Sequence, residues 1–421
     1  MTAPSGQEFV DIASPSPQSA AAKHIALFVR TMEGGVGRKF LHLAKAFAKR
    51  GHRVDVLVLQ AEGPYLKELP AAIQAVILDI APDFKTLPVL LRLPKTTRRL
   101  LPLGLLSSPP RMIRALPALK HYLQKEKPDI LLAAIEDAGI VALWAKWLAG
   151  VPTRVVVKNV AAFSQQLLAN ATKLFECVLP MLIQQWYPQA DGIIAVSNGA
   201  ADDLAQVTGL SRQLITTIYN PLDLDLIANQ ATQTVADSWL LSGQPPVLIA
   251  VGRLEPQKDY PTLLRAFAQL RKTCAAYLII MGEGNQRPLL EALCRELGIA
   301  ADVRLPGFVN NPYSYMARAA VLVLSSAWEG FPNVLLEALA CGCPVVSTNC
   351  PSGPDELLAG GVYGRLVPVS DYPALAQAIL ETLAAPRESE KLLQRARLFS
   401  LDTVVDQYLQ ILLGCDATTV P

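Results

Sequence analysis

The sequence predicts an α/β protein built on two doubly wound parallel sheets, in two Rossmann-like domains that face each other across a cleft. Short apolar runs alternate with helical patterns, glycines follow the first apolar run, and one polar, proline-flanked stretch interrupts the alternation. Alternating strands and helices are typical of parallel sheets covered on both faces. The 421 residues also suit two domains, since domains average roughly 100–200 residues.

The first half begins with a strand, a turn rich in glycine, a helix and a second strand. Residues 24–29 and 54–59 are mostly apolar and predict the two strands. Gly34, Gly35 and Gly37 lie after the first of them. The remaining elements predicted in this half are helices over 40–48 and 140–148 and strands over 130–134, 154–157 and 193–196.

The second half repeats this alternation after the interruption at 220–246, which we interpret as the connection between domains. Its predicted strands span 247–251, 277–281, 321–324 and 344–346, and its helices span 261–271, 287–297 and 333–340. We therefore expect a flexible tail over 1–22, a first domain over 23–218, a second over 219–400, and a C-terminal helix over 401–421 that packs back on the first domain.

Composition excludes several classes of protein. With 51% apolar residues and a net charge of +2, the chain is neither disordered nor a general nucleic-acid binder. No uncharged apolar run approaches the roughly 18 residues of a membrane-spanning helix, and the first 22 residues do not resemble a secretory signal. The seven cysteines include no Cys-x-x-Cys pair, which favours reduced thiols in a cytoplasmic protein over a zinc site.

Residues 84–125 are unusual because they contain basic residues without any Asp or Glu. Leu, Ile and Pro are interleaved with nine cations, namely Lys85, Arg92, Lys95, Arg98, Arg99, Arg111, Arg114, Lys120 and Lys125. One interpretation is a solvated helical face. The other, which we favour, is a surface that rests on anionic lipid, where each basic residue adds about 1 kcal/mol.

The second half contains the candidate ligand-binding residues. Strand 247–251 leads into Gly252 and Arg253, with Lys258 five residues later. Open parallel sheets bind ligands at the carboxyl ends of their strands, and a guanidinium with an ammonium suits a diphosphate. Taken alone, this spacing also fits a charged loop before a helix.

Two further strand ends reinforce the pattern. Strand 277–281 ends at Gly282 and Gly284, where the backbone can approach a ligand. Strand 321–324 leads to Glu329 and to Pro332, which suits the start of a helix whose free N–H groups attract phosphate. Glu337 follows about one turn into that helix, so two carboxylates can reach two hydroxyl-bearing parts of one ligand.

Over about residues 191–369 these motifs resemble glycosyltransferase family 4, which has the GT-B fold and transfers sugar from a nucleotide-sugar with retention of configuration. The resemblance rests on the segments 251–258, 282–284, 306–308 and 329–342, and also on 195–197, 219–221 and 350–356. In the first half, the glycine turn and its helix fit the family.

The resemblance implies a role for each matching residue. Arg253 and Lys258 would bind the donor diphosphate, Glu337 the ribose hydroxyls and Glu329 the sugar hydroxyls. The remaining implied donor contacts are the glycines and the backbone of two turns, namely Gly34, Gly35, Gly37, Gly282, Gly284, Phe308, Val309, Phe331, Pro332, Asn333 and Val334.

The first domain departs from the family at one position. Many relatives have a His after the strand that corresponds to 130–134, and here we align Asp137 with it. Asp137 would orient a hydroxyl at the reacting centre. Two alternatives stay open: a shift of one residue would give the role to Glu136, and an Asp before a helix is often only its N-cap.

The sequence therefore predicts a retaining glycosyltransferase that uses a nucleotide-sugar, with UDP as the expected nucleotide. No cofactor and no catalytic metal are expected, and Asp223-Leu-Asp225 is interpreted as part of the connection. We expect a lipid-linked or surface-glycan acceptor and a peripheral position on the inner face of the cell membrane. The rivals are a transferase with a soluble acceptor, a nucleotide-sugar epimerase or phosphorylase of the same fold, and an inactive binding protein.

Overall fold

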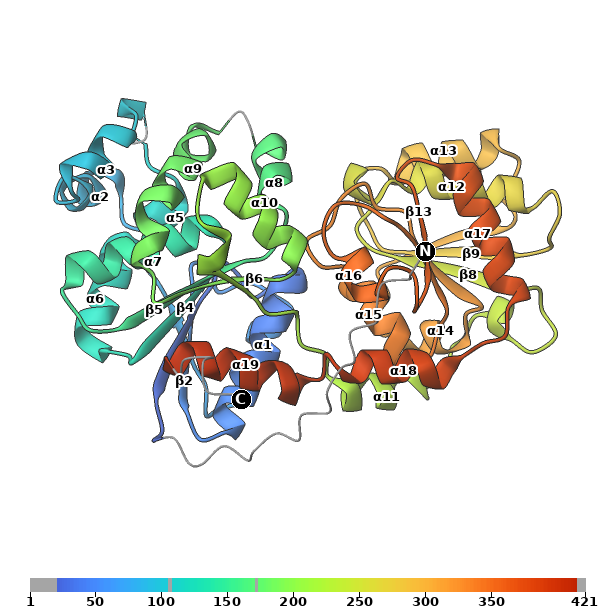
Figure 1. Cartoon of the computed structure of the whole chain (residues 1–421), viewed down its shortest axis with the longest axis horizontal. Coiled ribbons are helices and arrows are strands. Elements are labelled where there is room, and N and C mark those ends of the chain that lie inside the picture. Colours follow the sequence, from blue (N-terminus) through green and yellow to red (C-terminus); the bar gives the residue numbers. More distant parts are fainter. Residues whose placement is uncertain (1–20, 105–107, 171–172, 415–421) are drawn as a thin grey trace, which may run out of the picture.

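The computed structural model describes residues 21–104, 108–170 and 173–414, and it shows two α/β domains, each built on a parallel sheet (Figure 1). The strands of the first sheet run in the order β3-β2-β1-β4-β5-β6-β7. They span His24–Phe28 (β1), Arg53–Val58 (β2), Gln74–Ile77 (β3), Ile130–Ala134 (β4), Arg154–Asn159 (β5), Gly192–Ala195 (β6) and Ile215–Thr217 (β7). The order reverses between β1 and β4, which is where such sheets bind ligands.

Helices cover both faces of this sheet because alternate strand residues point to opposite sides. In β1, Ile25 and Leu27 pack with α1, whereas Ala26 and Phe28 pack with α7 and α9. The helices of the first domain span Gly34–Lys49 (α1), Asp83–Leu90 (α2), Lys95–Leu100 (α3), Arg111–Arg114 (α5), Leu116–Glu126 (α6), Glu136–Ala149 (α7), Phe163–Ala169 (α8), Leu174–Trp186 (α9) and Asn198–Thr208 (α10).

The second sheet has the order β10-β9-β8-β11-β12-β13 and repeats the same winding. Its strands span Val247–Val251 (β8), Tyr277–Met281 (β9), Val303–Gly307 (β10), Val321–Leu324 (β11), Val345–Thr348 (β12) and Arg365–Val367 (β13). Its helices span Leu224–Ala231 (α11), Tyr260–Leu270 (α12), Arg287–Glu296 (α13), Tyr313–Arg318 (α14), Asn333–Ala340 (α15), Pro354–Leu358 (α16), Tyr372–Ala384 (α17) and Ser389–Arg397 (α18).

The last helix, α19 (Leu401–Leu413), lies on the first domain beside α1 (Figure 1). Its Tyr408 is fully buried, and its Asp406 pairs with Arg50 of α1. The Nε of Arg154 also donates to the Leu412 carbonyl over 3.2 Å. The chain thus crosses between the domains twice, and Leu222 and Ser400 form a short parallel bridge where the two crossings meet.

The structure corrects two details of the sequence interpretation. Residues 220–246 are not a simple connection, because they contain α11, which packs on α14 and α15 of the second domain. Asp223 is the N-cap of that helix and accepts a hydrogen bond from the Leu226 amide (2.9 Å). Pro332 is the N-cap of α15 and not its first helical residue, and the helix itself spans Asn333–Ala340, as predicted.

No helix within the three described ranges is long and apolar enough to cross a membrane.

Candidate active site

The carboxyl ends of both sheets face a central cavity of about 310 Å³ between the domains. It is lined by Gly35 from the first domain and, from the second, by five predicted ligand residues, namely Arg253, Lys258, Glu329, Phe331 and Asn333. Gly35 belongs to the first turn of α1, so the predicted glycine turn is the helix start itself. The N-terminal turns of α1 and α15 therefore both open toward this cavity, which suits an anion.

A second cavity of about 580 Å³, the outer cavity, adjoins the first through Gly35 and Arg253. Gly282, Phe308, Val309 and Glu337 line it, so the residues expected around the base and the ribose lie together. Gly34, Pro332 and Val334 are immediate chain neighbours of residues that line the two cavities.

Two of the predicted glycines pack against backbone. A Cβ atom at Gly37 would lie 2.4 Å from the Met32 carbonyl carbon, and one at Gly284 would lie 2.3 Å from the Leu254 carbonyl oxygen. Both distances are too short for any side chain. These glycines therefore let the turns after β1 and β9 fold tightly.

The cation and the carboxylate expected to bind the two ends of the donor are in contact with each other. The Nζ of Lys258 lies 2.6 Å from Oε1 of Glu329, which also accepts a hydrogen bond from the Ser326 hydroxyl (2.7 Å). Both charged side chains are largely buried. Arg253 differs, because its side chain is 71% exposed and its ion pair with Glu255 (2.8 Å) lies at the surface. Its guanidinium therefore has room to turn toward a ligand.

Glu337 links the two domains. Its Oε1 lies 3.4 Å from the guanidinium of Arg38 on α1 and accepts a hydrogen bond from the Tyr313 hydroxyl (3.4 Å). Since Glu337 is buried, these two contacts fix its carboxylate at the wall of the outer cavity. A ribose at this wall would meet an oriented carboxylate.

Comparison with known proteins now identifies the family. Residues 33–226 match the model described as Glycosyltransferase Family 4, and residues 232–399 match the model described as Glycosyl transferases group 1. The chain belongs to this glycosyltransferase family. The first matched segment covers β2 to β7 of the first sheet, and the second covers the whole second sheet.

Named relatives agree with this assignment. The chain is 35% identical to N-acetylgalactosamine-N,N'-diacetylbacillosaminyl-diphospho-undecaprenol 4-alpha-N-acetylgalactosaminyltransferase of Campylobacter jejuni over 280 residues, which is 65% of this chain and 73% of the relative. It is 27% identical to the lipopolysaccharide core biosynthesis glycosyltransferase LpsE of Rhizobium meliloti, over 90% of this chain and 96% of the relative.

Solved structures confirm the predicted GT-B fold. The Anabaena protein HepE in complex with UDP-glucose superposes with a TM-score of 0.72 at 21% identity, covering 93% of this chain and all of that one. At this identity the likeness speaks for the fold only.

In this glycosyltransferase Asp137 lies apart from the other predicted residues, in a third cavity of about 940 Å³ on the first domain. This first-domain cavity adjoins the central one through Val36. Asp137 forms an ion pair with Arg30, and its other oxygen accepts from the Ala138 amide (2.8 Å). The residue is not the N-cap of α7, since Ile135 holds that position.

The neighbouring Glu136 points into the protein. It is fully buried, the Asn159 amide donates to its Oε1, and burial raises its pKa to about 7. Ile135 adopts φ +79°, a conformation that is strained for a β-branched residue. This turn aims Asp137 at the cavity and Glu136 at the core, so the geometry favours Asp137 for contact with a ligand.

Motifs that fit the family, but to which sequence analysis gave no role, form the contact between the domains. The carboxylate of Glu356 accepts hydrogen bonds from the Asn198 and Gly199 amides (2.7 and 2.8 Å), at the start of α10 in the other domain. The Ser197 hydroxyl donates to the Gly330 carbonyl (2.7 Å), next to Glu329. The site thus depends on a direct contact between loops of the two domains.

Sequence reasoning missed three cations in the first domain, namely Arg30, Lys39 and Lys158. Arg30 follows β1, and Lys158 lies at the end of β5. The rule that selected Arg253, a cation at the carboxyl end of a strand, would have found both. Lys39 lies within α1, where nothing in the pattern distinguishes it from a solvated helix residue.

Proposed function

We propose that this glycosyltransferase uses a UDP-sugar as donor, retains the anomeric configuration, and acts on a lipid-linked or surface-glycan acceptor. The observation that carries the proposal is the pair of cavities between the domains, in which cations, two helix starts and two carboxylates converge. The name of the Campylobacter jejuni relative includes an undecaprenol-linked substrate, and HepE was solved with UDP-glucose.

The central cavity suits the diphosphate of the donor. During transfer, the bond between the anomeric carbon and the diphosphate oxygen breaks, and its electron pair stays on that oxygen. Arg253 and Lys258 offset the negative charge that develops there, which is the usual route by which such sites lower a barrier. Because these cations face the diphosphate directly, we propose that no catalytic metal is needed.

The first-domain cavity suits the acceptor. An acceptor hydroxyl forms the new bond to the anomeric carbon, and its proton passes to a phosphate oxygen of the leaving diphosphate. Asp137 accepts a hydrogen bond from a hydroxyl of the acceptor and so orients it, and Arg30 holds the carboxylate in place. Asp137 is therefore proposed as an orienting group, not as a base.

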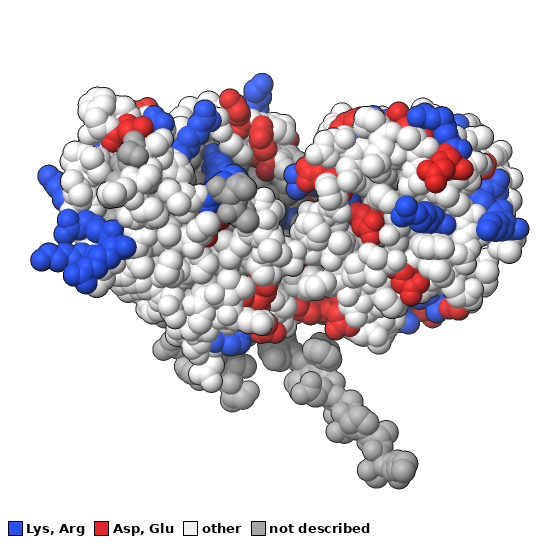
Figure 2. All heavy atoms as spheres, turned by 90° about the horizontal axis from the view of Figure 1, so that it is seen from above, with Lys and Arg blue, Asp and Glu red and all other residues white. Residues whose placement is uncertain are grey.

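We also propose that α2, α3 and their flanking loops rest on anionic lipid at the inner face of the membrane. Phe84, Leu91 and Leu103 expose 72, 49 and 84% of their surface, among exposed cations. Figure 2 shows Lys and Arg gathered at the end of the first domain where Figure 1 places these helices. Two cations of the segment are paired instead: Arg114 with Asp83 (3.3 Å) and Lys125 with Glu126 (3.5 Å).

The test is a panel of nucleotide-sugars, each incubated with the protein alone and with undecaprenyl-diphosphate-linked sugars. We expect a new glycolipid and free UDP only when donor and acceptor are both present, undiminished by a metal chelator. Formation of a different nucleotide-sugar without acceptor would indicate an epimerase. Activity with donors of another nucleotide only, or only after metal addition, would contradict the UDP or the metal-free part of the proposal.

A further inference from the structure

Two lysines in the wall of the central cavity have surroundings that are unusual for buried charges. Lys39, from α1, and Lys158, from the end of β5, expose only 5 and 2% of their surface. Their ammonium groups donate to neutral oxygens of the crossing between the domains: Lys39 to the Pro221 carbonyl (2.8 Å) and Lys158 to Oδ1 of Asn220 (3.2 Å). Within the described part of the chain, no carboxylate lies within 4.0 Å of either ammonium.

This arrangement is costly without an anion. Buried ammonium groups are normally paired with a carboxylate, because removing an unpaired charge from water costs several kcal/mol. Burial lowers the pKa of Lys39 to about 8, although attraction from Glu337 and Asp223 opposes the shift. Burial lowers the pKa of Lys158 to about 7, and repulsion from Lys39 contributes. Each ammonium has three N–H donors and uses one of them here, so both can still donate to a ligand.

The opposite wall of the same cavity has the same sign of charge. Arg253 and Lys258 line it from the second domain, and Glu329 is the carboxylate among the lining residues. Four basic residues line the cavity against one carboxylate, so the lining carries an excess of positive charge. The diphosphate of a nucleotide-sugar carries two negative charges, so a ligand of that class would offset most of the excess.

We propose that Lys39 and Lys158 form the first domain's half of the diphosphate site, opposite Arg253 and Lys258. The inference rests on the proposed function, because it takes the donor diphosphate to occupy the central cavity. The two lysines would also connect donor binding to the crossing at Asn220 and Pro221, since both ammonium groups contact it. The alternative is that these contacts only hold the crossing in place.

The experiment measures binding of UDP, inorganic pyrophosphate and uridine by calorimetry to the whole chain and to four variants. Lys39→Met and Lys158→Met remove the charge at similar length, and Lys158→Gln keeps a hydrogen-bond donor for Asn220 in case the methionine variant does not fold. Lys45→Met is the matched control, because Lys45 is an exposed lysine of the same helix, α1. Thermal unfolding of each variant reports whether the fold is intact.

We expect each neutral variant to bind UDP and pyrophosphate on the order of tenfold more weakly, while uridine binding stays at the parent value. The unfolding temperature should not fall, since an unpaired buried charge has been removed. Parent-like binding of both anions by the Lys39 and Lys158 variants would overturn the proposal and leave a purely structural contact. Should the parent bind pyrophosphate through these lysines but not uridine or UDP, the lysine site would stand and the UDP-sugar assignment would fail.

Discussion

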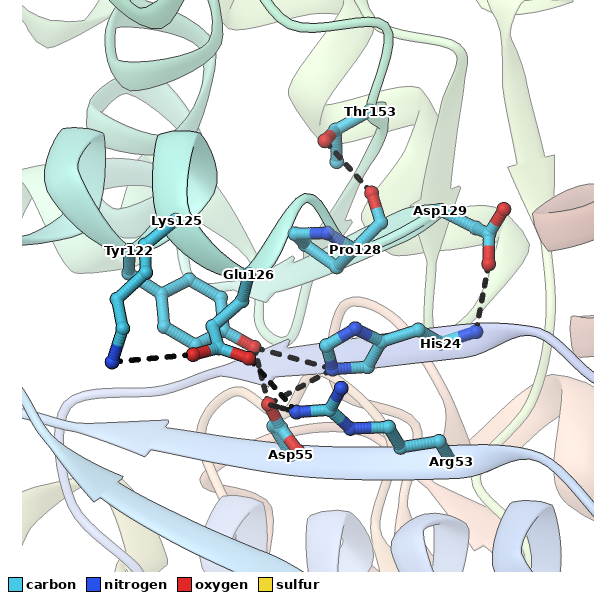
Figure 3. A network of polar contacts seen from close by, with 9 residues as sticks. All are labelled: His24, Arg53, Asp55, Tyr122, Lys125, Glu126, Pro128, Asp129 and Thr153. Atoms are coloured by element: carbon cyan, nitrogen blue, oxygen red, sulfur yellow. Dashed lines mark hydrogen bonds and ion pairs between the residues drawn. The ribbon is translucent and has the colours of Figure 1, made fainter.

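Two charged clusters lie at opposite ends of the strands of the first domain, and they are built differently. At the amino ends, the buried carboxylate of Asp55 accepts a hydrogen bond from the Tyr122 hydroxyl (2.6 Å) and lies 2.9 Å from Nε2 of His24 (Figure 3). Arg53 lies 3.6 Å from the same carboxylate and pairs with Glu126 (2.9 Å). Lys125 in turn lies 3.5 Å from Glu126, so two cations and two carboxylates balance the charge of the cluster.

At the carboxyl ends, Lys39 and Lys158 are buried like Asp55 but contact neutral oxygens. A balanced cluster around a buried carboxylate is expected to hold secondary-structure elements together, here β1, β2 and α6. An unbalanced one lowers stability and is expected to persist only where a ligand supplies the missing charge. The comparison therefore separates charges that stabilise the fold from charges that an anionic ligand would neutralise.

The largest expected effect tests the carboxyl end. In Lys258→Ala the cation beside Glu329 is lost, and the charge that develops on the leaving diphosphate is less well offset. We expect sugar transfer to fall on the order of 100- to 1000-fold, with an unchanged circular dichroism spectrum. Lys272→Ala, at an exposed lysine of the second domain, is the control and should keep parent activity. Near-normal transfer by Lys258→Ala would remove it from the diphosphate site.

The next prediction tests the amino end. Asp55→Asn keeps the shape but removes the charge that His24, Arg53 and Tyr122 surround, so the free energy of unfolding should fall by about 3 kcal/mol. Transfer activity per folded molecule should not change, because the cluster lies at the far end of the sheet. Asp129→Asn, at a half-exposed carboxylate, should cost at most about 1 kcal/mol.

The same variant has a predicted dependence on pH. Burial would raise the pKa of Asp55, but hydrogen bonds from His24 and Tyr122 outweigh it and hold the pKa below its usual value. A carboxyl with a lowered folded pKa stabilises above its unfolded pKa, and that contribution is lost as pH falls through the folded value. The stability gap between parent and Asp55→Asn should therefore narrow in acid; a gap that widened would show that the charge of Asp55 is not stabilising.

The central strands of both sheets could be predicted from sequence, whereas the four edge strands could not. β1, β2, β8 and β9 are largely buried on both faces, and most of their residues are apolar. The edge strands β3, β7, β10 and β13 are short and partly exposed, and β10 includes a proline. Water can hydrogen-bond to the free backbone groups along one side of an edge strand. Such a strand therefore need not be apolar, and it lacks the sequence pattern that identified the central strands.

The candidate site was predictable in the second domain and only partly in the first. Arg253, Lys258, Glu329 and Glu337 follow strand ends in a fixed order, and each strand end is a local pattern. Lys39 gains its environment from residues far along the chain, since its ammonium contacts Pro221. Such a contact depends on how the crossing between the domains folds, which no local pattern encodes.

A smaller effect distinguishes the two carboxylates of the second domain. Glu337→Ala should weaken UDP binding about tenfold, because the ribose loses a hydrogen-bonded acceptor. Glu329→Ala should leave UDP binding unchanged but weaken UDP-sugar binding by a similar factor, since it is assigned to the sugar. Calorimetry with UDP and with a non-hydrolysable UDP-sugar analogue measures both. If the two variants bound both ligands like the parent, neither carboxylate would touch the donor.

The smallest expected effect concerns charges that belong to neither cluster, the exposed cations of α3. Lys95→Glu combined with Arg99→Glu reverses two of them, and each basic residue near an anionic surface contributes about 1 kcal/mol. We expect binding to vesicles of phosphatidylglycerol and phosphatidylcholine to weaken at least fivefold. Added salt should weaken the parent toward the variant, because this attraction is screened over about 8 Å at physiological ionic strength.

A matched control keeps this last test specific to α3. Lys45→Glu with Lys49→Glu changes the net charge by the same amount, at exposed lysines of α1. If the surface around α3 docks on lipid, this control should sediment with anionic vesicles like the parent, and the exposed Phe84 and Leu103 should leave some binding in the α3 variant. Equal losses in both double variants would indicate attraction by net charge alone. Equal sedimentation of the parent with anionic and neutral vesicles would instead reduce the cations of α3 to an ordinary solvated face.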